Sequence, residues 1–186
     1  MSNGLKYFIG NWKMFGIPSS SKILDRINKF YSKDNNRNKY KIVVAPPYTL
    51  LQNFSKRYKN RKIIISAQNC HHKDYFGSYT GSISPFMLKK MGIRFVIIGH
   101  SEIRASGDND KIIKEKVSLA IKNNFNVILC IGENKKERDK KKTLIVLRRQ
   151  ISNVLKRKYN FKSIIIAYEP IWSIGTGKVP STIELK

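Results

Sequence analysis

The stretch SIIIAYEPIWSIGTGK, residues 163–178, decides the fold of this chain. Its residues 164–167 form an unbroken apolar run rich in β-branched side chains, which is typical of a parallel strand buried on both faces. Glu169 follows at the carboxyl end of that strand, where α/β proteins keep their chemistry. Residues 171–177 combine apolar side chains with glycines, so the stretch favours a general base beneath a closing flap. The alternative interpretation is an ordinary strand-to-helix junction with a solvated glutamate.

Similar apolar runs recur along the whole chain, and segments with helical periodicity lie between them. Such alternation indicates a parallel sheet with helices packed outside it. No linker or shift in composition divides the chain, so we predict one domain, residues 1–186, of the α/β class. The predicted strands are residues 7–9, 42–45, 63–67, 95–98, 127–131 and 164–167.

The predicted helices carry apolar residues at helical spacing, and Ser19 or Ser20 is a candidate N-cap for the first of them. A polar loop at residues 69–84 precedes a short helix, and loops of this length are usually functional. A further helix is expected to begin at Thr182. The predicted apolar faces are Ile23, Ile27 and Phe30; Leu51, Phe54 and Tyr58; Ile113, Val117, Ala120 and Ile121; and Leu144, Leu147, Ile151 and Val154.

The composition is globular but strongly basic, with 37 Lys and Arg against 12 Asp and Glu and a net charge of +25. This charge invites a nucleic-acid interpretation. The basic residues are spread over almost every segment. The one dense run, residues 135–142, is broken by Glu137 and Asp139, and no aromatic residues alternate with it. We therefore favour a base-composition bias in the genome and expect no nucleic-acid partner.

The cysteine count and the hydropathy pattern bear on the compartment. Cys70 and Cys130 are too few for a disulfide scaffold and fit a reducing compartment. No apolar run is long enough to span a membrane, and the amino terminus has no apolar signal core. These features predict a cytoplasmic protein without a membrane partner.

Polar residues gather where the predicted strands end: Asn11, Lys13, His100, Glu133 and Glu169. In a (β/α) barrel the carboxyl ends of the strands share one face, and that face holds the active site. Taken alone, each residue could also have a purely structural role, because Lys13 is one lysine among many and a lone histidine is usually structural. Their common position at strand ends favours the functional interpretation.

These motifs, taken in order, resemble the triosephosphate isomerase family along the chain from about residue 5 to its end. The resemblance rests on Asn11-Trp12-Lys13-Met14, Ala67-Gln68-Asn69, Gly99-His100-Ser101-Glu102, Cys130-Ile131-Gly132-Glu133, Ala167-Tyr168-Glu169-Pro170-Ile171-Trp172 and Gly175-Thr176-Gly177-Lys178.

The resemblance implies interconversion of dihydroxyacetone phosphate and glyceraldehyde 3-phosphate, with neither a cofactor nor a metal. It assigns Glu169 as the base, His100 as a neutral electrophile and Lys13 as the cation beside the enediolate and the phosphate. Asn11 and Gly175 are implied as further substrate-binding residues. The alternatives are a catalytically impaired isomerase fragment and a basic RNA-binding remnant.

The chain also departs from the family pattern. A complete (β/α)₈ barrel takes about 250 residues, and here about six of eight βα units are expected, with strands seven and eight lacking. A fragment, completion by a second polypeptide and gene decay all remain open as explanations. The resemblance implies a homodimer in which Thr80 of the third loop reaches the neighbouring site. Ser82 and Ile103 replace a charged pair of that interface, so we expect an interface that is retained but repacked.

Overall fold

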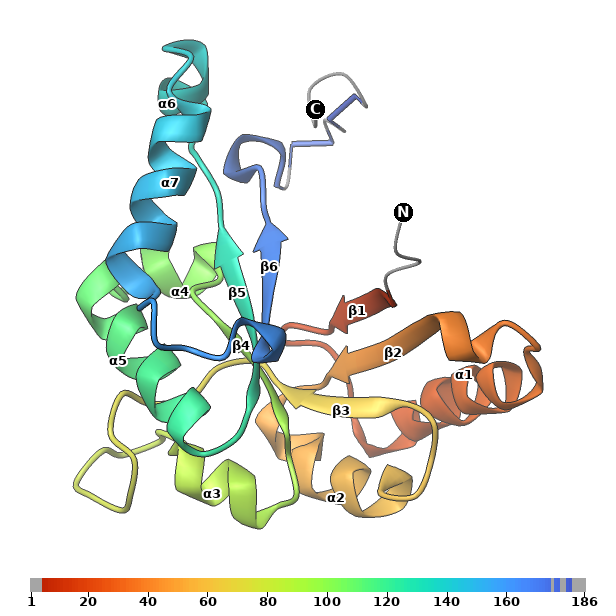
Figure 1. Cartoon of the computed structure of the whole chain (residues 1–186). Helices are drawn as coiled ribbons and strands as arrows, with labels where there is room; N and C mark the ends of the chain where they lie inside the picture. The colour runs from red at the N-terminus through yellow and green to blue at the C-terminus, as the bar shows by residue number, and fades with distance from the viewer. Residues whose placement is uncertain (1–4, 175, 178–179, 182–186) are drawn as a thin grey trace.

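The computed structural model describes residues 5–174, 176–177 and 180–181. Within them, six parallel strands form one sheet in the sequential order β1 to β6. Figure 1 shows the sheet curling, with the helices on its outer side. The α/β fold predicted from the sequence is therefore confirmed. The strands are β1 (Lys6–Asn11), β2 (Tyr40–Ala45), β3 (Ile64–Ala67), β4 (Phe95–Ile98), β5 (Asn126–Ile131) and β6 (Ile164–Tyr168).

Helices connect the strands and differ in length from 5 to 13 residues. Short 3₁₀ turns at Pro18–Ser20, Arg37–Lys39, Phe161–Ser163 and Ile171–Ser173 complete the described connections. The helix predicted from Thr182 lies outside the described residues. The helices are α1 (Ser21–Lys33), α2 (Tyr48–Tyr58), α3 (Pro85–Lys90), α4 (Ser101–Ala105), α5 (Asp110–Lys122), α6 (Lys135–Asp139) and α7 (Thr143–Val154).

Successive residues of the central strands β2 to β5 alternate between two apolar layers, as the pleat of a β-strand requires. One layer packs against the helices and includes Val44, Val96, Ile98, Val127, Leu129 and Ile131. The other lines the opposite face of the sheet and contains Val43, Ala45, Phe95, Ile97, Ile128 and Cys130. Burial on both faces explains why the strands read as continuous apolar runs.

The predicted apolar face is wrong in register in α1, and in α7 it is wrong only at its first residue. In α1 the buried residues are Leu24 and Tyr31, whereas Ile23 and Phe30 are exposed by 52% and 67%. Tyr31 can be buried because its hydroxyl donates to the backbone oxygens of Tyr40 and Arg37. The predicted faces of α2 and α5 are correct in their buried residues.

In α7 the predicted Val154 is buried and the predicted Leu147 and Ile151 pack against the core, whereas Leu144 is exposed by 66%. Val146 and Gln150 are buried on the same helix and were not predicted. Gln150 can be buried because its side-chain amide pairs with both backbone groups of Gly132, in the segment after β5.

Candidate active site

The strand ends meet through a connected chain of polar contacts that runs from β1 to β6. The Lys13 ammonium lies 2.9 Å from Glu102 Oε1, and Glu102 Oε2 lies 3.6 Å from Nδ1 of His100. The Nε2 atom of His100 lies 3.2 Å from Glu169 Oε1. The structure thus brings together Lys13, His100 and Glu169, which come from three different strand ends, as expected for the carboxyl face of a βα fold.

Glu169 directly follows β6, and its carboxylate is held by two groups from the end of β4. One is Nε2 of His100; the other is the backbone N–H of Ser101, which donates to Oε2 over 3.2 Å. The Glu169 side chain is exposed by 20% and that of His100 by 9%. A carboxylate so placed is largely shielded from bulk water, which strengthens its interactions.

The ring of His100 is oriented by the helix that follows it. The backbone N–H of Glu102, in the first turn of α4, donates to Nδ1 of His100 over 3.2 Å. This contact uses Nδ1 as an acceptor and leaves Nε2 facing Glu169.

Lys13 lies in an unusual backbone conformation, with φ of +53°. Its N–H donates to Oδ1 of Asn11 over 3.0 Å, and its carbonyl accepts from Nε2 of Gln68 over 2.8 Å. The same Gln68 nitrogen also donates to the carbonyl of Ala45 over 2.8 Å. Left-handed conformations cost energy in residues other than glycine and persist where surrounding contacts fix them. In the sequence, Gln68 stands out only as part of a motif, because its role depends on these long-range contacts.

The ammonium of Lys13 also affects the acid beside it. Its hydrogen bond to Glu102 lowers the pKa of that carboxyl below the ordinary value, and its charge contributes in the same direction. Glu102 therefore remains ionised around neutral pH and holds the ammonium at the mouth of the site.

Glu133 is fully buried and organises the segment that follows β6. Its Oε1 accepts from the hydroxyl of Tyr168 and from Nε1 of Trp172, each over 3.0 Å. Arg138 lies 3.3 Å from the same oxygen and stacks 4.3 Å above the Trp172 ring. Burial raises the pKa of Tyr168, and its hydrogen bond to Glu133 adds to the effect. In the sequence, Glu133 stands out only as a polar residue at a strand end, and Tyr168 and Trp172 only as parts of a motif.

Gly132 gives the backbone of Glu169 room to approach β5. A Cβ atom at Gly132 would lie 1.8 Å from the Glu169 carbonyl oxygen, so a side chain cannot fit without a shift. The N–H of Glu169 donates to Ile131 over 2.8 Å. The amide of Gln150 pairs with both backbone groups of Gly132, each over 2.9 Å, and fixes this junction from α7.

Arg104 joins the ends of two neighbouring strands behind the site. Its guanidinium donates to the carbonyls of Gly99 over 2.8 Å and of Cys130 over 3.3 Å. It also pairs with Asp110 at 2.9 Å. The carbonyl that precedes His100 and the end of β5 are thereby held together.

Some predicted residues are not brought to the site or cannot be located. Gly175 lies outside the described residues. Thr80 is exposed on the third loop.

Within the ranges described, no cluster of three or more His, Cys, Asp or Glu side chains is arranged to hold a metal ion. Among those same residues no helix is long and apolar enough to cross a bilayer.

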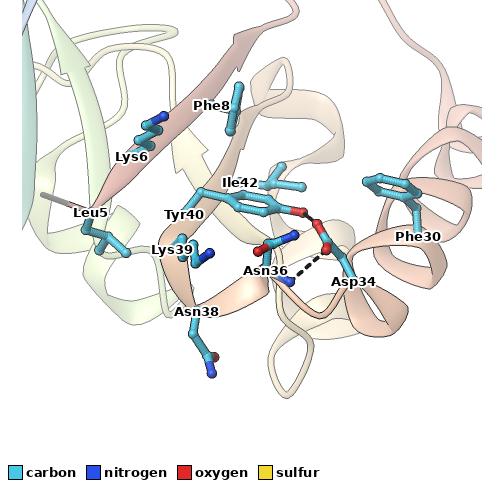
Figure 2. Close-up of a pocket in the computed structure, with 10 residues that line it drawn as sticks. All are labelled: Leu5, Lys6, Phe8, Phe30, Asp34, Asn36, Asn38, Lys39, Tyr40 and Ile42. Atoms are coloured by element: carbon cyan, nitrogen blue, oxygen red, sulfur yellow. Dashed lines mark hydrogen bonds between the residues drawn. The ribbon is translucent and has the colours of Figure 1, made fainter. Parts of the chain in front are cut away.

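The largest cavity described, about 850 Å³, lies away from these residues at the β1 and β2 edge. Figure 2 shows Phe8, Phe30 and Tyr40 around it, with the Tyr40 hydroxyl directed at Asp34. None of the strand-end polar residues lines it. Its position beside the first strand gives it no part in the chemistry of the strand ends.

Comparison with known proteins identifies relatives along nearly the whole chain. A family model described as triosephosphate isomerase matches residues 6–186. A triosephosphate isomerase of Wolbachia pipientis wMel is 43% identical over 173 residues, which make up 93% of this chain and 67% of that protein. The triosephosphate isomerase of Bartonella henselae is 40% identical over 187 residues, covering 100% of this chain and 73% of that protein.

A solved structure shares the fold as well. The crystal structure of triosephosphate isomerase from Bartonella henselae superposes with a TM-score of 0.83 at 39% identity, covering 90% of this chain and 68% of that one. The matched part of the chain thus spans between 67% and 73% of the length of these relatives.

Proposed function

Because the chain belongs to the triosephosphate isomerase family, whose members interconvert dihydroxyacetone phosphate and D-glyceraldehyde 3-phosphate, we propose that Glu169 is the base of this reaction and His100 its electrophile. The observation that carries the proposal is the 3.2 Å contact between Nε2 of His100 and Oε1 of Glu169, at the ends of β4 and β6. This pair suits a substrate that loses a proton from the carbon next to a carbonyl group. The base removes the proton, and the hydrogen-bond donor stabilises the negative charge that develops on the carbonyl oxygen.

The reaction needs one proton to move between adjacent carbons and one between adjacent oxygens. Glu169 takes the proton from the hydroxyl-bearing carbon of the ketose, and the electron pair passes through an enediolate. The carboxylic acid so formed returns the proton to the neighbouring carbon. The N–H at Nε2 of a neutral His100 donates a hydrogen bond to the oxygen on which negative charge develops.

Lys13 supplies a fixed positive charge beside the enediolate and the phosphate, and Asn11 and Gly175 complete substrate binding. Support for Lys13 comes from its backbone, which Asn11 and Gln68 hold in place. Its ammonium already lies against an acid at the site mouth. A preorganised cation stabilises developing charge without reorganising as the reaction proceeds.

The segment 171–176 acts as a flap over the site. Its contacts to buried Glu133 through Trp172 anchor one end, while Ile174 is exposed by 38%. Closure of an apolar flap excludes water and suppresses loss of phosphate from the enediolate. No metal or cofactor takes part in this scheme.

The working form is a homodimer, in our proposal, with Thr80 of the third loop reaching the partner's site. The loop after β1 carries a contiguous run of exposed apolar residues, with Met14 exposed by 94%, Phe15 by 75% and Ile17 by 65%. Exposed apolar clusters of this kind mark protein interfaces.

The protein is proposed to act in the cytoplasm, in glycolysis and gluconeogenesis, as one domain. Both cysteines are free and buried, which suits a reducing compartment. The triose phosphate is the one small-molecule substrate, and the scheme needs no membrane.

Deuterium exchange tests the assigned base directly. Dihydroxyacetone phosphate is incubated in D₂O with the chain or with its Glu169→Gln variant, and the methylene signal is followed by proton NMR. We expect incorporation with the chain and a rate lower by a factor of about 10² or more with the variant, since it has no base. Equal exchange rates would remove Glu169 from this role.

A further inference from the structure

A groove of about 490 Å³ opens at the other end of the sheet from the candidate active site, where β3 and β4 begin. Five basic side chains and no carboxylate are among the described residues that line this groove, which we call the basic groove. All five are exposed, and within the described part of the chain none forms an ion pair. They are Lys56, Lys59, Arg61, Lys90 and Arg94.

The same charge continues around that end of the sheet. In the connections from α1 to β2, α2 to β3, α3 to β4 and α7 to β6, the one carboxylate is Asp34, which accepts from the Tyr40 hydroxyl. Acidic groups lie instead at the opposite end, among them Glu102, Asp108, Glu133 and Glu169. The further basic residues of these connections are Arg37, Lys39, Lys62, Lys156, Arg157, Lys158 and Lys162.

Two ordinary explanations account for only part of this pattern. Cations stabilise the negative carboxyl end of a helix, which applies to Lys56 and Lys90 in the last turns of α2 and α3. Arg94 donates to the carbonyl of Lys89, in the last turn of α3, over 3.4 Å, so the same explanation covers it. Lys59 and Arg61 lie beyond the last residue of α2. A base-composition bias adds lysine to exposed segments at both ends alike and does not separate the carboxylates from them.

We propose that the basic groove binds the phosphate backbone of a nucleic acid strand. A surface that repeats positive charge over several connections fits a ligand that repeats negative charge along its length. The prediction of no nucleic-acid partner rested on the even spread of charge along the sequence, and the spatial segregation changes that expectation.

The walls of the groove argue for contacts to phosphate alone. Tyr58 is 4% exposed and its hydroxyl is engaged by Asp25 and Ser21, so it offers no ring for base stacking. Ile63 and Ile93 are 3% and 1% exposed, so they offer no apolar surface for insertion into a lipid bilayer. Binding is therefore independent of base sequence and sensitive to salt.

The test measures fluorescence anisotropy of a labelled 20-nucleotide single-stranded RNA with the 186-residue chain, between 50 and 200 mM salt. The groove variant is Lys56→Gln, Lys59→Gln, Arg61→Gln. The matched control, Lys136→Gln, Lys140→Gln, Arg148→Gln, removes the same charge from α6, α7 and the segment between them. Circular dichroism verifies that each variant folds, and Lys59→Gln with Arg94→Gln replaces the triple variant if that fails to fold.

We expect the groove variant to weaken binding about ten-fold or more and to reduce the salt slope by roughly two, given about 0.7 per single-strand phosphate contact. The control should change affinity less than about three-fold, because its charges lie away from the strand. DNA of the same sequence should bind similarly if phosphate is the ligand, and much weaker binding would restrict the ligand to RNA. Equal losses in both variants, absence of RNA binding at 50 mM salt, or binding only to phosphatidylglycerol vesicles would overturn the proposal.

Discussion

The position of the Glu169 carboxylate is set by its neighbours rather than by its own strand. Oε1 faces His100 and Oε2 accepts from the Ser101 N–H, so both oxygens are oriented by the end of β4. Its backbone lies against Gly132 of the adjoining connection. The geometry of Glu169 therefore depends in part on Ser101 and Gly132, which have no role in the proposed chemistry.

Replacing Gly132 with alanine tests this dependence. We expect Gly132→Ala to destabilise the chain by roughly 1–3 kcal/mol, because the added Cβ overlaps the Glu169 carbonyl and forces a backbone shift. Urea denaturation measures the effect. The control is Gly10→Ala on β1, where a Cβ meets nothing within 4 Å. Equal unfolding midpoints for the two variants would contradict the described contact.

The ion pair between Lys13 and Glu102 predicts a pH dependence. The pKa of Glu102 is lowered in the folded chain, so its stabilising contribution is present above the ordinary value of 4.5 and is lost as pH falls through the lowered value. The Glu102 side chain is 54% exposed, so the contribution is at most about 1 kcal/mol. Unfolding midpoints of the chain and of Glu102→Gln should differ at pH 7, and the difference should shrink as the pH falls below 4.5. A difference that persists unchanged at pH 3 would exclude this pair as its cause.

At this scale the sequence identified residues that are polar where an apolar strand ends. Asn11, Lys13, His100 and Glu169 have that local signal. Gln68 also follows an apolar strand, but its role and that of Gly132 depend on contacts with residues 55 and 18 positions away. Contacts of that kind appear only once the chain is folded.

Among the elements, α7 shows how one polar residue positions a helix against the sheet. Gln150 is 8% exposed, and its amide satisfies the N–H and the carbonyl of Gly132. Buried polar groups need hydrogen-bond partners, so these two hydrogen bonds help to determine which face of α7 packs against the sheet.

Removal of that amide has a predictable cost. We expect Gln150→Leu to destabilise the chain by roughly 2–4 kcal/mol, since two buried backbone groups lose their partners at about 1–3 kcal/mol for each. The control on the same helix is Asn153→Leu, whose amide bonds Asp110 in an exposed position. Chemical denaturation distinguishes the two. A smaller loss for Gln150→Leu than for Asn153→Leu would refute the assigned role.

The existence and order of the elements could be predicted because apolar runs alternate with helical patterns. Most helix faces could be predicted, because the buried apolar residues of α2, α5 and α7 recur at helical spacing. The face was wrong in α1, where Tyr31 is buried with its hydroxyl bonded to backbone oxygens, and the burial of Gln150 in α7 was not predicted. Periodicity of hydrophobicity does not contain that information.

For the molecule as a whole, the six-stranded sheet leaves β1 and β6 with one neighbour each in the part that the structure describes. Phe8 on β1 is exposed by 58% and Ile166 on β6 by 43%. Exposed edges with apolar side chains favour association between chains. The sequence predicted the parallel topology.

The proposed dimer makes a separate prediction about where association occurs. We expect Phe15→Glu to shift the chain from dimer to monomer, because a charge would be buried in the interface. Sedimentation velocity measures the mass. Phe30→Glu, which alters an equally exposed phenylalanine on α1, should leave the dimer intact. A dimer that resists Phe15→Glu, or forms only after Ser82→Glu with Ile103→Arg, would contradict the retained interface.

The most direct test of the account is isomerase activity of the purified 186-residue chain with D-glyceraldehyde 3-phosphate, measured beside its Glu169→Gln variant. The account predicts formation of dihydroxyacetone phosphate above the uncatalysed rate, lowered by a factor of about 10² or more in the variant. Activity that is the same in both proteins, or a folded chain without any activity, would contradict the claim that the residues at the ends of β1, β4 and β6 carry the reaction.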